Sequence, residues 1–121
     1  MSERQDLLRE EMRFRILRHV ETNPEISQRE LAKLIGVSLG SLNYTLGALI
    51  DVGFVKLANF SASNNKRGYA YMLTPRGLSE KTTLTRRFLR RKREEYAALR
   101  AEIEALQQEV SDDHASAPRR G

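Results

Sequence analysis

The sequence is short, basic and free of cysteine. Its 121 residues fit one small domain with an extension, because typical domains span about 100 to 150 residues. Lysine and arginine outnumber acidic residues by 21 to 16, and the net charge of +5 favours an anionic partner. The absence of cysteine excludes disulfides and thiolate metal sites, and no apolar run approaches the roughly 18 residues of a membrane span. We therefore expect a soluble, cytoplasmic protein without a signal peptide.

The first predicted helix covers about residues 6–21. Its apolar side chains recur every four positions, with charged residues between them, which is typical of an amphipathic helix. They are Leu8, Met12, Ile16 and Val20, with Leu17 beside them. Asn23-Pro24 ends the helix, because proline disfavours helical geometry in the residue before it.

Two further helices follow at short intervals. Ser27 and Glu30 have the spacing of a capping box, which predicts a helix that begins at Gln28 and ends at Gly36. Its expected apolar face consists of Leu31, Leu34 and Ile35. Ser38 is the expected N-cap of a third helix over about residues 39–52, ended by Gly53. This third helix is expected to bury Leu42, Leu46, Leu49 and Ile50.

After Gly53 the apolar period changes from helical to alternating. Phe54, Val55, Leu57 and Phe60 have β character, and residues 69–74 alternate as a second strand would. The polar stretch 61–68 between them predicts the tip of a β-hairpin.

Thr74-Pro75 starts a long charged helix that is expected to reach about Val110. Its second half carries apolar residues at alternating spacings of three and four, the pattern of a coiled-coil seam. We predict that it forms a homodimer through Leu89, Tyr96, Leu99, Ile103, Leu106 and Val110. Residues 111–121 lack periodicity and are expected to be disordered. The predicted division is a domain over 1–77, a dimerisation helix over 78–110 and a tail.

The predicted fold is mainly α with a small β-hairpin, a winged helix-turn-helix followed by a long C-terminal coiled-coil helix. In this fold the helix after the turn presents its N-terminal residues to the major groove of double-stranded DNA. Asn43 is the best candidate for a base contact, because its amide can donate to and accept from the edge of adenine. The predicted DNA-binding residues are Gln28, Arg29, Ser38, Ser41, Asn43, Tyr44, Asn65, Lys66 and Arg67.

Several features admit more than one interpretation. The polar face of the third helix fits either a DNA-reading surface or ordinary solvated surface. Six cations between Arg86 and Arg93 fit phosphate contacts, pairing with acidic residues of another chain, or solubility, and the last two are favoured. The alternative for the whole chain is a protein-interaction module that uses its long helix, because fold does not fix function.

Catalytic and cofactor sites find little support in the sequence. His19 and His114 are the only histidines, one on a charged helix and one near the end of the chain, with no zinc-site spacing. The glycines punctuate helices and do not form a phosphate-binding G-x-G-x-x-G turn. We therefore expect neither an enzyme nor a metal or cofactor site.

Two stretches resemble a known family of regulators. Residues 27–57, SQRELAKLIGVSLGSLNYTLGALIDVGFVKL, resemble the helix-turn-helix of the MarR family, and AYMLTPRG at 70–77 is similar to the exit of its wing. The similarity is closer to the small EPS-associated subgroup and extends through LTRRFLRRKREEYAALRAEIEAL at 84–106. The resemblance implies a bacterial dimeric transcription regulator of exopolysaccharide genes. It also implies DNA contacts at Ser38, Ser41, Asn43, Tyr44 and the Lys66-Arg67 wing. The chain departs from larger MarR proteins in lacking a long N-terminal helical segment before the DNA-binding domain, so we expect dimerisation mainly through the C-terminal helix.

Overall fold

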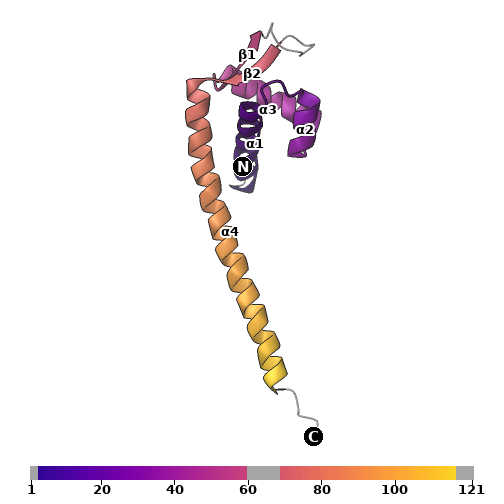
Figure 1. Cartoon of the computed structure of the whole chain (residues 1–121), viewed down its shortest axis with the longest axis vertical. Helices are drawn as coiled ribbons and strands as arrows, with labels where there is room; N and C mark the ends of the chain where they lie inside the picture. The colour runs from indigo at the N-terminus through magenta and orange to yellow at the C-terminus, as the bar shows by residue number, and fades with distance from the viewer. Residues whose placement is uncertain (1–2, 60–68, 117–121) are drawn as a thin grey trace. The chain divides into compact units, whose positions relative to one another are not determined.

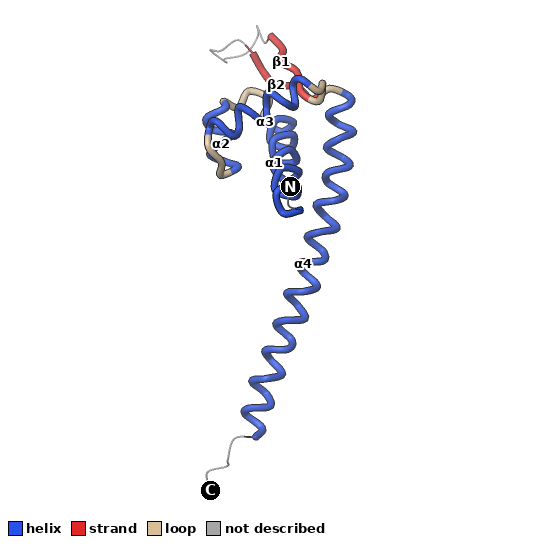
Figure 2. Tube along the Cα trace, turned by 180° about the vertical axis from the view of Figure 1, so that it is seen from behind, coloured by secondary structure: helices blue, strands red, loops and turns tan. Residues whose placement is uncertain are grey.

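The computed structural model describes residues 3–59 and 69–116. Three helices are followed by a two-stranded antiparallel sheet and one long helix (Figures 1 and 2). The elements are α1 (Glu3–Thr22), α2 (Gln28–Ile35), α3 (Leu39–Asp51), β1 (Val55–Asn59), β2 (Tyr69–Leu73) and α4 (Pro75–Ser116). The chain forms two compact units, residues 1–86 and 87–121, and α4 contributes to both.

The core of the first unit lies among α1, α2, α3 and the sheet. Its fully buried side chains come from every element of this unit, including the start of α4. The largest of them are Ile16, Leu17, Val20, Leu31, Leu42, Leu46, Leu49, Val55, Tyr71 and Leu84. Leu84 is part of this core, and the first compact unit accordingly extends to residue 86.

Only the second half of α1 is buried. Phe14 lies in the core, whereas Leu8, expected on the apolar face, is 57% exposed. The helix also begins at Glu3, earlier than its apolar repeat suggested. Periodicity located the apolar face, but the length of helix that its neighbours cover depends on tertiary contacts that the sequence pattern does not contain.

The turn between α2 and α3 has the geometry of a helix-turn-helix. Ser27 caps α2, its side chain accepting from the Glu30 amide at 3.0 Å, which is the serine half of the predicted capping box. Gly36 ends α2 with φ +84°, a left-handed conformation that favours glycine. The two helix axes differ in direction by 107°, within the range typical of this motif.

The inner face of α2 differs from the expected one. Leu34 is 61% exposed, and Ala32 lies in the core in its place. Because 3.6 residues complete a helical turn, Leu31, Ala32 and Ile35 share one side of the helix, and Leu34 lies at its margin. The predicted burial of Leu34 was therefore wrong.

The hairpin pairs β1 with β2 in a register that sets Val55 opposite Leu73 and Leu57 opposite Tyr71. Tyr71 fastens this sheet to the helices. Its side chain is buried, its amide donates to the Pro24 carbonyl at 2.9 Å, and its hydroxyl accepts from Gln28 Nε2 at 3.0 Å. The wing strand is thus held to both the start of α2 and the loop before it.

One residue, Thr74, separates β2 from α4. Its hydroxyl accepts from the Gly77 amide at 3.0 Å, as an N-cap does, and its amide donates to the Phe54 carbonyl at 3.0 Å. A Cβ atom built on Gly77 would lie 1.9 Å from that same carbonyl oxygen. The first turn of α4 therefore packs directly on the backbone that precedes β1.

Helix α4 continues to Ser116, past the expected end at Val110 and into the stretch expected to be disordered. Ion pairs between residues about one turn apart lie on its exposed surface and favour the helical conformation, among them Lys92 with Glu95 at 3.1 Å and Arg100 with Glu104 at 3.3 Å.

Within the described ranges no single helix is both long and apolar enough to cross a membrane. Only α2 and α3 taken together reach that length and apolar character, and they are bent by 107° at the break between them.

Candidate nucleic-acid interface

The outer face of α3 gathers four of the residues predicted to bind DNA. Ser38, Ser41, Asn43 and Tyr44 are all exposed, and the aromatic side chain of Tyr44 is 82% exposed. The opposite face buries Leu42, Leu46 and Leu49, which fixes the rotation of the helix about its axis. The polar face therefore points outward because the apolar face is held in the core.

Ser38 has a structural role in addition to its position on this face. As the N-cap of α3, its hydroxyl oxygen accepts from the Ser41 amide at 3.1 Å. The hydroxyl can still donate its proton outward, because a serine hydroxyl is both donor and acceptor. Its predicted contact with DNA is thus compatible with its capping role.

The outer face of α3 carries hydrogen-bonding groups and few charges. Asp51, in the last turn, is the helix's one charged residue. An amide, hydroxyls and a phenol can read base edges, but they give little attraction to phosphate in general. Cations for phosphate contacts must come from other elements.

Arg29 and Gln28 lie together at the start of α2 but differ in their surroundings. Arg29 is exposed, as its predicted contact with a phosphate requires. The Gln28 side chain is half-buried, and its amide nitrogen already donates to Tyr71. Tyr71 is a positioning residue that sequence reasoning missed, because the alternation of β2 indicated burial but not a hydrogen bond to a residue 43 positions away.

The predicted wing contacts, Asn65, Lys66 and Arg67, lie outside the described residues. The two strands that carry them are described and pair as expected on either side of that segment.

Neither the backbone conformation nor the packing of α3 requires glycine at Gly40 or Gly47. Neither has a positive φ, and a Cβ atom on either would meet nothing within 4 Å. A helical glycine destabilises a protein by about 1 kcal/mol relative to alanine. Gly40 is exposed in the first turn, where the helix would approach base pairs most closely, and Gly47 is farther along the helix.

Gly40→Ala is therefore expected to raise the free energy of unfolding by about 0.5 to 1 kcal/mol and to weaken DNA binding. Chemical denaturation and DNA titration on the same preparation measure the two effects. Gly47→Ala is the matched control, with a similar gain in stability and a smaller effect on binding. Equal DNA affinity in all three proteins would show that the backbone at Gly40 is not approached by DNA.

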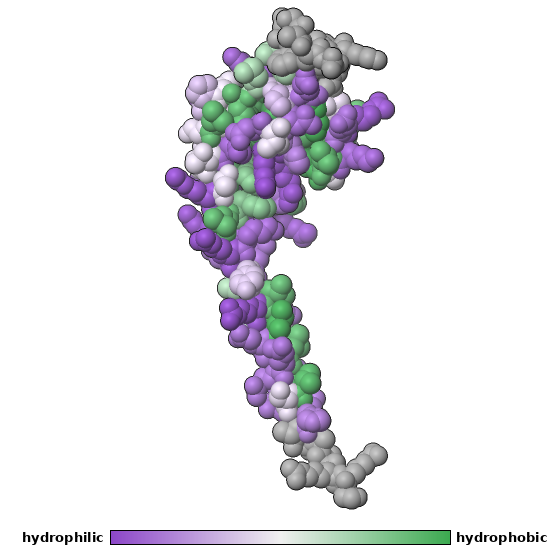
Figure 3. Space-filling view, in the orientation of Figure 1, coloured by the Kyte–Doolittle hydropathy of each residue, from purple (hydrophilic) through white to green (hydrophobic). Residues whose placement is uncertain are grey.

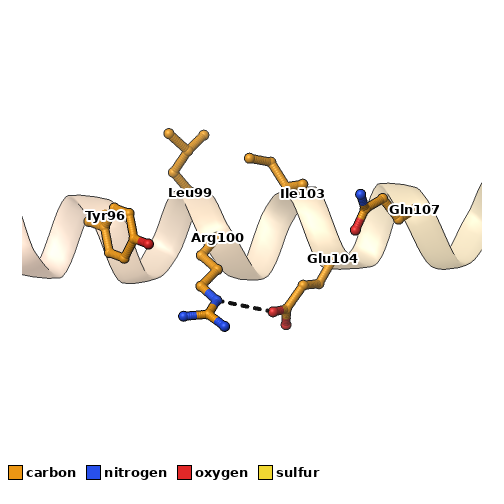
Figure 4. A pocket seen from close by; sticks show the side chains of 6 residues that line it. All are labelled: Tyr96, Leu99, Arg100, Ile103, Glu104 and Gln107. Atoms are coloured by element: carbon orange, nitrogen blue, oxygen red, sulfur yellow. Dashed lines mark hydrogen bonds and ion pairs between the residues drawn. The ribbon is translucent and has the colours of Figure 1, made fainter.

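The second unit carries an exposed apolar strip along α4. Each of its six side chains is at least 46% exposed, and Figure 3 shows hydrophobic residues collected along one edge of the helix. The strip consists of Leu89, Tyr96, Leu99, Ile103, Leu106 and Val110, all the residues predicted for dimerisation. In Figure 4, Leu99 and Ile103 extend from the same side of the helix, and the Arg100–Glu104 ion pair lies on another side.

Among residues 3–59 and 69–116, no group of three or more histidine or acidic side chains is placed to hold a metal ion.

Comparison with known proteins agrees with this geometry. Residues 9–56 match the family model for winged helix-turn-helix DNA-binding. No curated protein sequence matches the chain.

Solved structures of MarR-type proteins share the fold. A MarR family protein of Mycobacterium tuberculosis, in complex with p-aminosalicylic acid, is 20% identical over 83% of this chain and 77% of its own, with a TM-score of 0.61. The PcaV transcriptional regulator of Streptomyces coelicolor is 20% identical over 87% and 73%, with a TM-score of 0.62. Streptococcus pneumoniae FabT in complex with DNA is 19% identical over 83% and 74%, with a TM-score of 0.51. The chain thus contains a winged helix-turn-helix and has the fold of MarR-type regulators.

Proposed function

We propose that the protein is a transcriptional regulator that binds double-stranded DNA in a sequence-specific manner as a homodimer. The observation that carries the proposal is the outer face of α3, where a helix fixed by a tight turn and a buried apolar side exposes groups able to read bases. The match of residues 9–56 to a DNA-binding family model supports it.

In this proposal the first turns of α3 enter the major groove. Asn43 contacts an adenine edge, and Ser38, Ser41 and Tyr44 bond to bases or phosphates. Arg29 contacts the backbone from the start of α2. Asn65, Lys66 and Arg67 contribute from the wing, where cations can reach phosphates or a narrow minor groove. Gln28 acts mainly through Tyr71, by fixing the wing strand against α2.

Homodimerisation uses the apolar strip of α4. Six large apolar side chains on a solvated helix are costly to leave exposed, and a second copy of the same strip would cover them. Two copies also give two DNA-reading helices, so the lack of positive charge on α3 is offset by a second set of contacts.

We further propose exopolysaccharide-related genes as the targets, on the resemblance of residues 84–106 to the EPS-associated subgroup. Mapping of bound genomic sites tests that assignment.

Electrophoretic mobility shift with genomic fragments tests the function. A complex that prefers particular sequences and weakens steeply with salt is expected, because phosphate contacts release counterions. Equal affinity for unrelated duplexes would overturn sequence-specific regulation. Absence of any DNA complex would favour the alternative, a protein-interaction module that uses α4.

Asn43→Ala is expected to relax base preference at one position of each half-site and to weaken binding by about 1 to 3 kcal/mol, if the amide makes a bidentate contact. Selection of bound sequences from a random library measures the preference. Because Asn43 is exposed, the substitution should leave the fold unchanged, which circular dichroism checks. An unaltered set of selected sequences would remove Asn43 from the reading surface.

A further inference from the structure

The charged residues that border the apolar strip of α4 are sorted by sign. In the heptad register set by the strip, Tyr96, Ile103 and Val110 occupy a positions, and Leu99 and Leu106 occupy d positions. The e positions, on one border, are Arg93, Arg100, Gln107 and His114. The g positions, on the other border, are Glu95, Glu102 and Glu109. One border is thus basic or neutral, and the other is wholly acidic.

This sorting distinguishes the two ways in which a second copy could cover the strip. In a parallel pair, each g residue faces the e residue five positions later on the partner helix. Glu95 then faces Arg100, Glu102 faces Gln107 and Glu109 faces His114. In an antiparallel pair, g faces g and e faces e, so three glutamates oppose three glutamates along one side. Charge complementarity therefore favours the parallel arrangement.

The apolar residues favour the same arrangement. Ile103 and Val110 are β-branched at a positions, and Leu99 and Leu106 fill d positions, the combination typical of parallel two-stranded coiled coils. The strip is interrupted near its N-terminal end, where Lys92 occupies the d position between Leu89 and Tyr96. The continuous apolar part of the paired segment therefore begins at Tyr96 and extends along the last turns of α4.

Within one chain Glu95 and Arg100 take part in exposed ion pairs. Glu95 pairs with Lys92 at 3.1 Å and Arg100 with Glu104 at 3.3 Å (Figure 4), and all four side chains are more than half exposed. Exposed pairs of this kind contribute little to stability, so Glu95 and Arg100 can exchange partners at small cost.

We propose that α4 pairs with a second copy of itself as a parallel, in-register, two-stranded coiled coil, with Glu95 of each chain facing Arg100 of the other. The inference rests on the proposed homodimer and adds its direction and register. Because the first unit precedes this segment in the chain, parallel pairing also sets both DNA-binding units at the same end of the coil.

Single cysteines test the direction, because the natural chain has none. Lys92→Cys and Asp113→Cys place a thiol at d positions near the two ends of the strip, about 30 Å apart at 1.5 Å per residue. A disulfide requires Cα atoms within about 7 Å. Under oxidation, each variant alone is expected to form a covalent dimer, whereas the control Ala101→Cys, on the opposite face, is not. A chain that sediments as a dimer but forms no cross-link in either variant alone would overturn the parallel arrangement, while the homodimer would stand. A wild-type chain that sediments as a monomer would overturn both.

Charge reversal tests the register. Arg100→Glu and Glu95→Arg are each expected to raise the dimer dissociation constant by about tenfold, because each sets like charges opposite each other at two sites. An equimolar mixture of the two variants is expected to recover dimerisation, since unlike chains restore both pairs. The mixture isolates the contact between chains, because changes within each helix persist in it. Failure of the mixture to recover would exclude the Glu95–Arg100 contact.

Discussion

Gly77→Ala is expected to lower the free energy of unfolding by about 3 kcal/mol, the upper end of the range for overpacking a core. The added Cβ would lie 1.9 Å from the Phe54 carbonyl oxygen and 2.9 Å from its carbonyl carbon. These are backbone atoms, and Thr74 holds the same carbonyl with its amide, so no flexible side chain can move aside. The first turn of α4 must therefore shift away from the sheet. Chemical denaturation followed by circular dichroism measures the loss.

Gly47→Ala is the control for this experiment. It adds the same methyl group to a helix, but nothing lies within 4 Å of the new atom, so stability should rise slightly. If both variants have the stability of the wild-type chain, the close packing of α4 on Phe54 is wrong.

The double variant Leu99→Glu with Ile103→Glu is expected to be monomeric and to lose about a hundredfold or more in apparent DNA affinity. Two neighbouring positions of the apolar strip would each bring a carboxylate against its copy in the partner, and burial of an unpaired charge is strongly unfavourable. DNA affinity falls when dimerisation is lost, because each single chain then binds a half-site without the gain in effective concentration that the second chain provides. Sedimentation velocity and DNA titration measure the two effects.

Ala101→Glu with Ala105→Glu is the matched control for this variant. It adds the same charges at the same four-residue spacing on the side of α4 away from the strip. It should remain dimeric and bind DNA as the wild-type chain does. If both double variants sediment as monomers, added charge alone explains the loss of the dimer. If the variant with Leu99→Glu and Ile103→Glu remains a dimer, the strip is not the interface.

Much of the fold was predictable because it depends on local signals. Gly36 marked the turn between α2 and α3, Ser38 marked the start of α3, and Pro75 marked the start of α4; each was confirmed at the expected position. These residues act through their own backbone or through neighbours within four positions. A sequence pattern contains that information in full.

The errors concern contacts between distant segments. The exposure of Leu34 and Leu8 depends on which neighbours cover each helix, and periodicity gives the direction of an apolar face but not its extent. The hydrogen bond of Gln28 to Tyr71 joins residues far apart in the sequence. For the candidate site, the exposure of Asn43 and Tyr44 follows from the burial of the opposite side of α3. The identity of a DNA-contacting residue, in contrast, stays a prediction until a complex is measured.

The spacing of the strip within the second unit imposes a condition on any insertion. Leu99 and Ile103 share one side of α4 because four residues complete little more than one helical turn. A single residue inserted between them would rotate the later part of the strip by about 100° about the helix axis and leave every side chain in it intact. Seven inserted residues, close to two full turns, would nearly restore its direction. This segment can therefore lengthen by whole heptads far more readily than by single residues.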